Sequence, residues 1–288
     1  MLIIKTPATS ANLSVGFDTL GLALNLYNEY KIENSDEMLF YGFNDFENDI
    51  DNLFQYSYSK FYEKYASKNT MKKIKCTLTK NDIPVSRGLG SSASMILAGV
   101  LASNSFNNLN ISFDECVEFA ASVEGHSDNV FACAYGKLTA STYIDSGYYH
   151  QTFDVDPNYI FYILIPSRKG STKVSRSLLP KKILLEDAVN NLSKIVMLPT
   201  LFGKYNFDLL KKILVDKVHE QYRYPYIPLY NDIKKESEKE NRIISISGSG
   251  PSVLMISKDH EINIPDVSKI YSIKRVYVCQ GLTMEVDE

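Results

Sequence analysis

The segment from Pro84 to Ser94, PVSRGLGSSAS, constrains the fold more than any other part of the chain. It leads directly into ASMILAGVLASNSF, a nearly all-apolar pattern typical of a helix buried on most sides. Gly88 and Gly90 let the backbone approach a ligand closely, and Ser91 and Ser92 bring hydroxyl groups to the helix start. Free amides and the positive end of the helix dipole favour an anion there. The segment predicts either a phosphate-binding loop or a simple helix-capping turn.

The composition is that of a globular chain without a strongly charged surface. Of 288 residues, 44% are hydrophobic and 23% are charged, and the net charge of −3 gives no reason to expect a nucleic-acid or anionic-membrane partner. No apolar run approaches the roughly 20 residues of a membrane span, and MLIIKTPATS lacks a signal-peptide layout, so we expect a cytoplasmic protein. The scattered cysteines have no metal or redox spacing, and we expect all four to be buried, reduced thiols.

Hydrophobic periodicity predicts a mixed set of strands and helices. The first strand is expected at residues 2–5, ending at Pro7, and the last at residues 276–281. The continuous apolar run YIFYILIP, 159–166, predicts a buried strand. In the second half we expect helices at 172–178, 186–202, 207–218 and 229–240. The turn-forming residues DVDPN, 154–158, predict a domain boundary.

Three loops rich in small residues recur along the chain, at residues 7–18, 84–94 and 247–252. The middle loop is not a Walker A motif, because Ala93 stands where its lysine would be. It does fit GxGxxA from Gly88 to Ala93, but the long loop with its proline and the lack of an acidic residue about 20 positions on argue against a dinucleotide site.

Phosphoryl transfer would also need a hydroxyl and a carboxylate for magnesium. Ser92 and Glu124 are candidates, although Glu124 could equally be a solvated helix end.

These loops resemble the motifs of the GHMP family of small-molecule kinases, and within it those of the homoserine kinase branch. The family's first, phosphate-loop and third motifs correspond here to PATSANLSVGFDTLGLAL, PVSRGLGSSAS and SISGSGPSV. The homoserine branch is indicated by EGHSDN (124–129), STKVSR (171–176) and HEQYR (219–223). The resemblance covers the chain from end to end.

The resemblance implies an α+β fold of two domains with ATP and substrate in the cleft between them. Residues 1–154 would form a domain like domain 2 of ribosomal protein S5, and residues 155–288 a ferredoxin-like domain. Ser92 and Glu124 would hold Mg²⁺. Backbone N–H groups of the phosphate loop would wrap the ATP phosphates, and this loop consists of Pro84, Val85, Ser86, Arg87, Gly88, Leu89, Gly90, Ser91, Ser92, Ala93 and Ser94.

The resemblance also implies a site for L-homoserine, a zwitterion with a terminal hydroxyl. Asp18 would face its ammonium group, while Arg176 and Arg223 would bind its carboxylate in the bidentate geometry that favours arginine. The remaining implied substrate residues are Asn12, His126, Asn129, Thr172 and Gly248.

Asn129 occupies the position at which other GHMP branches carry an aspartate that can act as a base. An asparagine can orient a hydroxyl but cannot take its proton. The implied catalytic residues, Ser92, Glu124 and Asn129, would therefore work by positioning and electrostatic stabilisation. The proton would leave through phosphate or solvent.

Two departures from the family pattern concern turns. Ser14 and Val15 replace the glycine and proline of the usual NLGPGFD, and Ser127 replaces the proline of EGHPDN. Neither change removes a chemical group, but both leave the local backbone geometry open.

The function implied is an ATP- and magnesium-dependent homoserine kinase that makes O-phospho-L-homoserine for threonine synthesis. The alternatives are another GHMP small-molecule kinase, acting on mevalonate or a sugar, or a non-catalytic binding member of the fold. The protein could also form a homodimer. The residues that contact adenine cannot be identified from the sequence, and we expect them near the helix that begins at Asn52.

Overall fold

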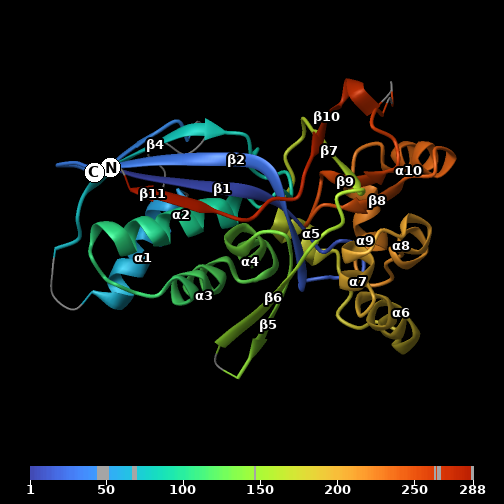
Figure 1. Ribbon diagram of the computed structural model, residues 1–288, viewed down its shortest axis with the longest axis horizontal. Coiled ribbons are helices and arrows are strands. Elements are labelled where there is room, and N and C mark those ends of the chain that lie inside the picture. The colour runs from blue at the N-terminus through green and yellow to red at the C-terminus, as the bar shows by residue number, and fades with distance from the viewer. Residues whose placement is uncertain (44–51, 67–69, 146, 263, 265–266, 287–288) are drawn as a thin grey trace.

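The protein is an α+β structure built on two β-sheets (Figure 1). The computed structural model describes residues 1–43, 52–66, 70–145, 147–262, 264 and 267–286. None of the helices in this part of the chain is long and apolar enough to cross a membrane.

The first sheet has seven strands, and helices cover one of its faces (Figure 1). Its main path runs β11 (Thr283–Val286), β1 (Leu2–Ala11), β2 (Leu20–Asn34), β4 (Ile74–Asn81) and β3 (Leu39–Tyr41). The hairpin of β5 (Leu138–Ile144) and β6 (Gly147–Phe153) joins this path through β2. The covering helices are α1 (Leu53–Tyr65), α2 (Ser91–Phe106), α3 (Phe113–Glu124) and α4 (Asp128–Tyr135).

The second sheet is a four-stranded antiparallel sheet in the order β10 (Tyr271–Val276), β7 (Ile160–Pro166), β9 (Val253–Ser257) and β8 (Ile243–Ile246). Every residue of β7 is buried, as its continuous apolar run predicted. The accompanying helices are α5 (Thr172–Ser177), α6 (Leu185–Ile195), α7 (Leu198–Gly203), α8 (Phe207–Ile213), α9 (Glu220–Arg223) and α10 (Tyr230–Lys239), with 3-10 turns at Tyr224–Tyr226 and Val267–Lys269.

The first strand is longer than predicted, because Pro7 interrupts the ladder without ending it. Proline has no N–H to donate, and the register of β1 against β2 shifts between Pro7 and Ala8. The strand then continues to Ala11. This extension carries the first motif across to the second sheet.

Two predicted helices and the last strand also differ from the structure. The helix expected at 186–202 is two helices, because Pro199 in the first turn of α7 has no N–H to donate to the carbonyl of Ile195, where α6 ends. The helix expected at 207–218 ends at Ile213, and the chain turns toward Asp216. Of the residues expected to form the last strand, 276–281, Val276 ends β10 and Val278 forms only an isolated bridge to Leu24. The last strand is β11, which pairs with β1.

Helix α2 is the buried centre of the first sheet's core, as its apolar pattern predicted. Twelve of its sixteen residues are buried. A separate apolar cluster joins the two sheets, with Leu22 and Leu89 on one side and Phe161 and Leu254 on the other. The phosphate loop therefore lies where the two sheets meet. Of the cysteines, Cys76, Cys116 and Cys133 are buried, whereas Cys279 is partly exposed, and all four are free thiols.

Candidate active site

A cavity of about 530 Å³ opens between the two sheets, at the N-terminus of α2. All eight residues predicted to bind the substrate line it: Asn12, Asp18, His126, Asn129, Thr172, Arg176, Arg223 and Gly248. Ser92 and Glu124 line the same cavity, together with several residues of the phosphate loop. The three motifs, far apart in sequence, thus meet at one concave surface.

The phosphate loop is fixed by hydrogen bonds to its carbonyl groups. Ser86 O accepts from Gly170 N, Arg87 O from Ser252 N, Gly88 O from Ser247 Oγ and Leu89 O from Thr9 N, at 2.7–3.2 Å. These acceptors, which would repel a phosphate, are already engaged by protein donors. The first amides of α2 have no partner within the helix, so the cavity offers donors to an anion.

The eleven predicted loop residues divide into two groups. Val85, Ser86, Gly88, Gly90, Ser91 and Ser92 line the cavity, whereas Pro84, Arg87, Leu89, Ala93 and Ser94 are not among its lining residues. Arg87 instead donates to the carbonyls of Val85, Pro166 and Ser167, which ties the loop to the second sheet. The Ser94 hydroxyl is fully buried and contacts Thr6 and Tyr30. Both side chains support the loop from behind.

Gly90, like Gly88, is a position of this loop at which a side chain would force its neighbours to move. Its φ is +72°, and a Cβ would fall on Thr9 Oγ1. We expect Gly90→Ala to lower the free energy of unfolding by about 2 kcal/mol or more and kcat/KM by roughly 100-fold, because Thr9 also orients Asn129. Thermal unfolding and initial rates measure the two effects.

Gly125 provides the matched control for stability. Its φ is +83°, yet nothing lies within 4 Å of its Cβ position. Gly125→Ala should therefore show only the cost of the backbone conformation. Equal losses of stability in the two variants would mean that the contact with Thr9 is unimportant.

Ser92 and Glu124 are brought together from α2 and α3 by a short hydrogen bond from Ser92 Oγ to Glu124 Oε2. Burial raises the pKa of Glu124, although His126 and the Ser92 hydroxyl oppose the change. The ionised form of a buried carboxylate is stabilised by a nearby cation. The described residues contain no group of three or more His, Cys, Asp or Glu side chains suited to a metal. A hydroxyl and one carboxylate nevertheless fit Mg²⁺, which usually keeps waters and takes phosphate oxygens as its other ligands.

His126 lies between two carboxylates. Its Nδ1 is 3.0 Å from Asp128 Oδ1, and its Nε2 is 3.6 Å from Glu124 Oε1. Burial lowers the pKa of His126, but the hydrogen bond to Asp128 and the charges of both acids outweigh this and raise it. The two acids thus favour the protonated form of His126 beside Glu124.

Asn129 is held in a single orientation by its neighbours. Thr9 Oγ1 donates to Asn129 Oδ1 at 2.6 Å, and Asn129 Nδ2 donates to Asp128 Oδ1 at 3.1 Å. The Thr9 hydroxyl therefore fixes the Oδ1 of Asn129 on the side of Thr9 and its Nδ2 on the side of Asp128. Thr9 was not predicted from the sequence, where it is one of several small residues in the first motif.

Asp18 and Arg176 form a bidentate ion pair across the cavity, with distances of 2.7 and 2.9 Å. Sequence reasoning assigned them to opposite ends of the substrate, and the structure adds that they lie against each other. Phe17 lies beneath the guanidinium groups of Arg176 and Arg223, whose centres are 5.9 and 5.3 Å from its ring.

Arg223 is a buried cation without an acidic partner. It is only 2% exposed, and no ion pair in the described part of the chain includes it. Its Nε is buried without a hydrogen-bond partner, while Nη1 contacts His219 and Gly248 O. Burial lowers its pKa to about 10, so Arg223 remains charged near neutral pH. A buried guanidinium that lines a cavity and forms no direct ion pair among the described residues is suited to a carboxylate ligand.

The first motif has a strained backbone. Asn12, Leu13 and Ser14 all have positive φ, at 72°, 42° and 63°. Ser14 stands where the family carries glycine, and its φ explains the family's preference. Contacts hold the turn: Asn12 Nδ2 donates to Gly248 O at 2.6 Å, and Ser14 Oγ donates to Glu220 Oε2 at 3.3 Å.

Some cavity residues carried no clear signal in the sequence. Leu53, Tyr56 and Met95 form an apolar part of the lining, and the first two belong to the helix beginning after Asn52. The sequence predicted the adenine site near this helix but identified none of its residues. Asp128 lay inside the EGHSDN motif but was given no role, although it lines the cavity.

Comparisons with known proteins agree with this geometry. Residues 52–137 match the family model of the GHMP kinases N terminal domain. Among curated proteins, the chain is 34% identical over 263 residues to a homoserine kinase of Clostridium botulinum, covering 91% of this chain and 88% of that protein. A homoserine kinase of Clostridium beijerinckii is 33% identical over 258 residues, covering 89% and 86%. The chain belongs to the homoserine kinase family.

Solved structures confirm the predicted GHMP kinase fold. A homoserine kinase from Cytophaga hutchinsonii superimposes with a TM-score of 0.82 at 28% identity, covering 99% of this chain and 97% of that one. A mevalonate kinase superimposes with a TM-score of 0.67 at 17% identity, covering 96% and 99%, and shares the fold alone. Membership of the homoserine kinase family makes this chain an ATP-dependent kinase. The boundary between residues 154 and 155 stays a prediction.

Proposed function

We propose that this protein transfers the γ-phosphate of ATP to the hydroxyl of L-homoserine, with Mg²⁺, giving O-phospho-L-homoserine. One observation carries the proposal. The cavity that joins the phosphate loop to Ser92 and Glu124 also contains the Asp18–Arg176 pair and Arg223, a cation whose Nε has no hydrogen-bond partner and which forms no ion pair in the described part of the chain. A phosphate site and an amino-acid zwitterion site thus share one space.

The charged groups of the cavity complement those of an amino acid. An ammonium beside Asp18 and a carboxylate beside Arg176 would align the substrate antiparallel to the existing ion pair, and Arg223 would gain its missing counter-charge. Thr172 lies at the same end of the cavity, with its hydroxyl 3.2 Å from that of Ser249. The substrate hydroxyl would then extend toward Asn129 and the phosphate loop.

The chain's own residues would promote transfer mainly by position. Amides at the start of α2 bind phosphate oxygens, Ser92 and Glu124 hold the magnesium, and Asn129 orients the acceptor hydroxyl. The magnesium ion supplies neutralisation of the phosphate charge. Asn129 cannot act as a base because it is an amide, so the proton leaves through phosphate or solvent.

The alternatives fit the cavity less well. Mevalonate has a carboxylate but no ammonium, and a neutral sugar has neither, so either would leave Asp18 without a charged ligand. A non-catalytic binding member is disfavoured because Ser92, Glu124 and the phosphate loop are all present and meet in one cavity. Production of a threonine precursor in the cytoplasm and assembly as a homodimer stay predictions.

A substrate panel tests the proposal. We expect ADP release with ATP, Mg²⁺ and L-homoserine, and little with mevalonate, galactose or homoserine lacking its amino group. Turnover of mevalonate or galactose without turnover of homoserine would contradict the proposed substrate. ATP binding without turnover of any alcohol would favour the binding protein.

A further inference from the structure

Behind the cavity, a buried histidine connects the first motif to Arg223. His219 is fully buried, and its Nε2 lies 2.7 Å from the carbonyl oxygen of Ser14. Its Nδ1 lies 3.0 Å from Arg223 Nη1. The ring stacks on Phe17, with centroids 5.1 Å apart, and Phe17 also underlies the guanidinium of Arg223.

The two partners of His219 determine its tautomer. A carbonyl oxygen can only accept, so Nε2 carries the hydrogen and donates it to Ser14 O. A guanidinium can only donate, so Nδ1 must offer its lone pair to Arg223. Burial lowers the pKa of His219, which keeps the ring neutral near pH 7. Each ring nitrogen therefore has its required role only in the neutral form.

We infer that His219 is a positioning residue for substrate recognition: its Nδ1 lone pair holds the Arg223 guanidinium toward the substrate carboxylate without cancelling its charge. A carboxylate at this position would also orient the arginine, but it would neutralise the cation that the substrate needs. A neutral acceptor leaves the charge of Arg223 available. The inference rests on the proposed function, because it assigns a carboxylate ligand to Arg223.

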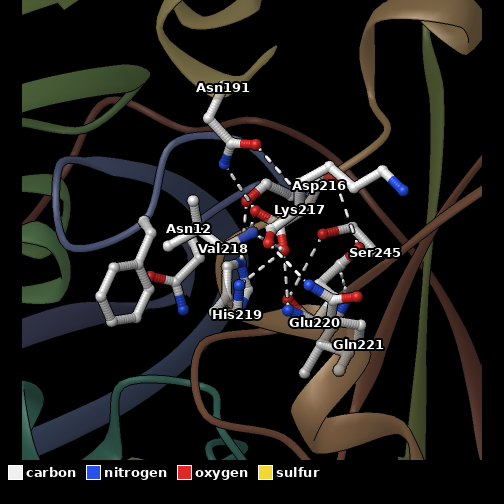
Figure 2. Close-up of polar contacts among 12 residues, drawn as sticks. Asn12, Asn191, Asp216, Lys217, Val218, His219, Glu220, Gln221 and Ser245 are labelled. Carbon is white, nitrogen blue, oxygen red and sulfur yellow. Dashed lines mark hydrogen bonds and ion pairs between the residues drawn. The ribbon is translucent and has the colours of Figure 1, made fainter. Parts of the chain in front are cut away.

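The surrounding network fixes where His219 lies (Figure 2). Asp216 Oδ2 accepts from the backbone amides of Val218, His219 and Glu220 at 2.7–3.1 Å, and Asn191 Nδ2 donates to Asp216 Oδ1 at 2.6 Å. Asp216 is thus occupied by these donors, and its nearest oxygen is 3.9 Å from His219 Nε2.

Glu220 secures the same segment to the third motif. Its Oε1 accepts from Ile246 N at 2.7 Å, just before the loop that contains Gly248. The carbonyl of Gly248 in turn accepts from Arg223 Nη1 and Asn12 Nδ2. Arg223 is therefore aimed by a rigid set of buried contacts, in which His219 is its only side-chain acceptor among the described residues.

Two substitutions separate the functions of the two ring nitrogens. Asparagine can present its Oδ1 where Nδ1 lies, whereas glutamine extends to the position of Nε2 and offers no acceptor at Nδ1. We expect His219→Gln to raise the KM for homoserine by about tenfold or more, with the KM for ATP changed less than about twofold. His219→Asn should restore much of the affinity for homoserine. A purely structural role would affect both Michaelis constants alike.

A double-mutant cycle with Arg223→Ala tests the route of action. If His219 acts through Arg223, His219→Gln should cause no further loss of kcat/KM for homoserine in the Arg223→Ala background. Losses that multiply would overturn the inference, as would an unchanged homoserine KM in a folded His219→Gln protein. Thermal unfolding of each variant checks that it is folded. Failure of the proposed function would look different, because the unaltered enzyme would then not turn over homoserine at all.

Discussion

Replacing Glu124 with glutamine should lower turnover by about 100-fold or more, because magnesium would lose the one charged ligand proposed for it. The glutamine side chain would retain the shape of the glutamate and could still accept a hydrogen bond from Ser92, so the fold should be unaffected. Steady-state ADP release, measured over a range of magnesium concentrations, gives the result. The magnesium concentration needed for half-maximal rate should rise together with the loss of rate.

Glu118 offers a matched control on the same helix. It lies on α3, is partly exposed and is not among the residues that line the cavity. Glu118→Gln should leave turnover and magnesium dependence unchanged. Full activity of Glu124→Gln at the magnesium concentration that saturates the unaltered enzyme would mean that the metal ligand is assigned wrongly.

Replacing Arg176 with alanine should raise the KM for homoserine by roughly 100-fold, because a charge-assisted bidentate contact contributes about 1.5–3 kcal/mol. The substitution also leaves Asp18 without its present partner, at distances of 2.7 and 2.9 Å. The KM for ATP should change little, since the phosphate loop is held by other contacts. Initial rates with each substrate varied separately distinguish the two constants.

Arg176→Lys tests whether charge alone is sufficient. Lysine keeps the positive charge but cannot contact a carboxylate through two parallel N–H groups, so we expect an intermediate KM for homoserine. An unchanged KM in Arg176→Ala would remove this residue from the substrate site. In that case Arg223 would be the only arginine left to bind the carboxylate.

Much of the fold followed from local pattern. Continuous apolar runs predicted the buried helix α2 and the buried strand β7, since an element without a polar side must be covered all round. The strand predictions were wrong where pairing with a distant strand overrode a local signal. Pro7 was taken as a strand end, but pairing with β2 carries β1 on to Ala11. The last strand was misplaced because the pairing of β11 with β1 joins opposite ends of the sequence.

The residues of the candidate site that lie in recognisable motifs were predicted from the sequence. All eight expected substrate residues line one cavity because five recognisable segments converge there: the first motif, EGHSDN, STKVSR, HEQYR and the third motif. The supporting residues were not predicted. Thr9 and His219 lie inside quoted motifs and Asp216 lies outside them, but nothing in the spacing of the three assigns them a role. Each depends on at least one partner more than 20 residues away: Thr9 on Asn129, His219 on Ser14 and Asp216 on Asn191.

The amino-acid sequence by itself determined that the loop from Pro84 to Ser94 precedes a buried helix and has a backbone open to phosphate. It also determined, through its family motifs, which polar groups accompany that loop. The tertiary structure decided which of those charged groups pair with one another and how they are oriented in the cavity. It paired Asp18 with Arg176, and it placed Arg223 against a neutral histidine with no ion pair to any acid among the described residues. Charge compensation depends on distances across the fold, and no local pattern in a sequence contains those distances.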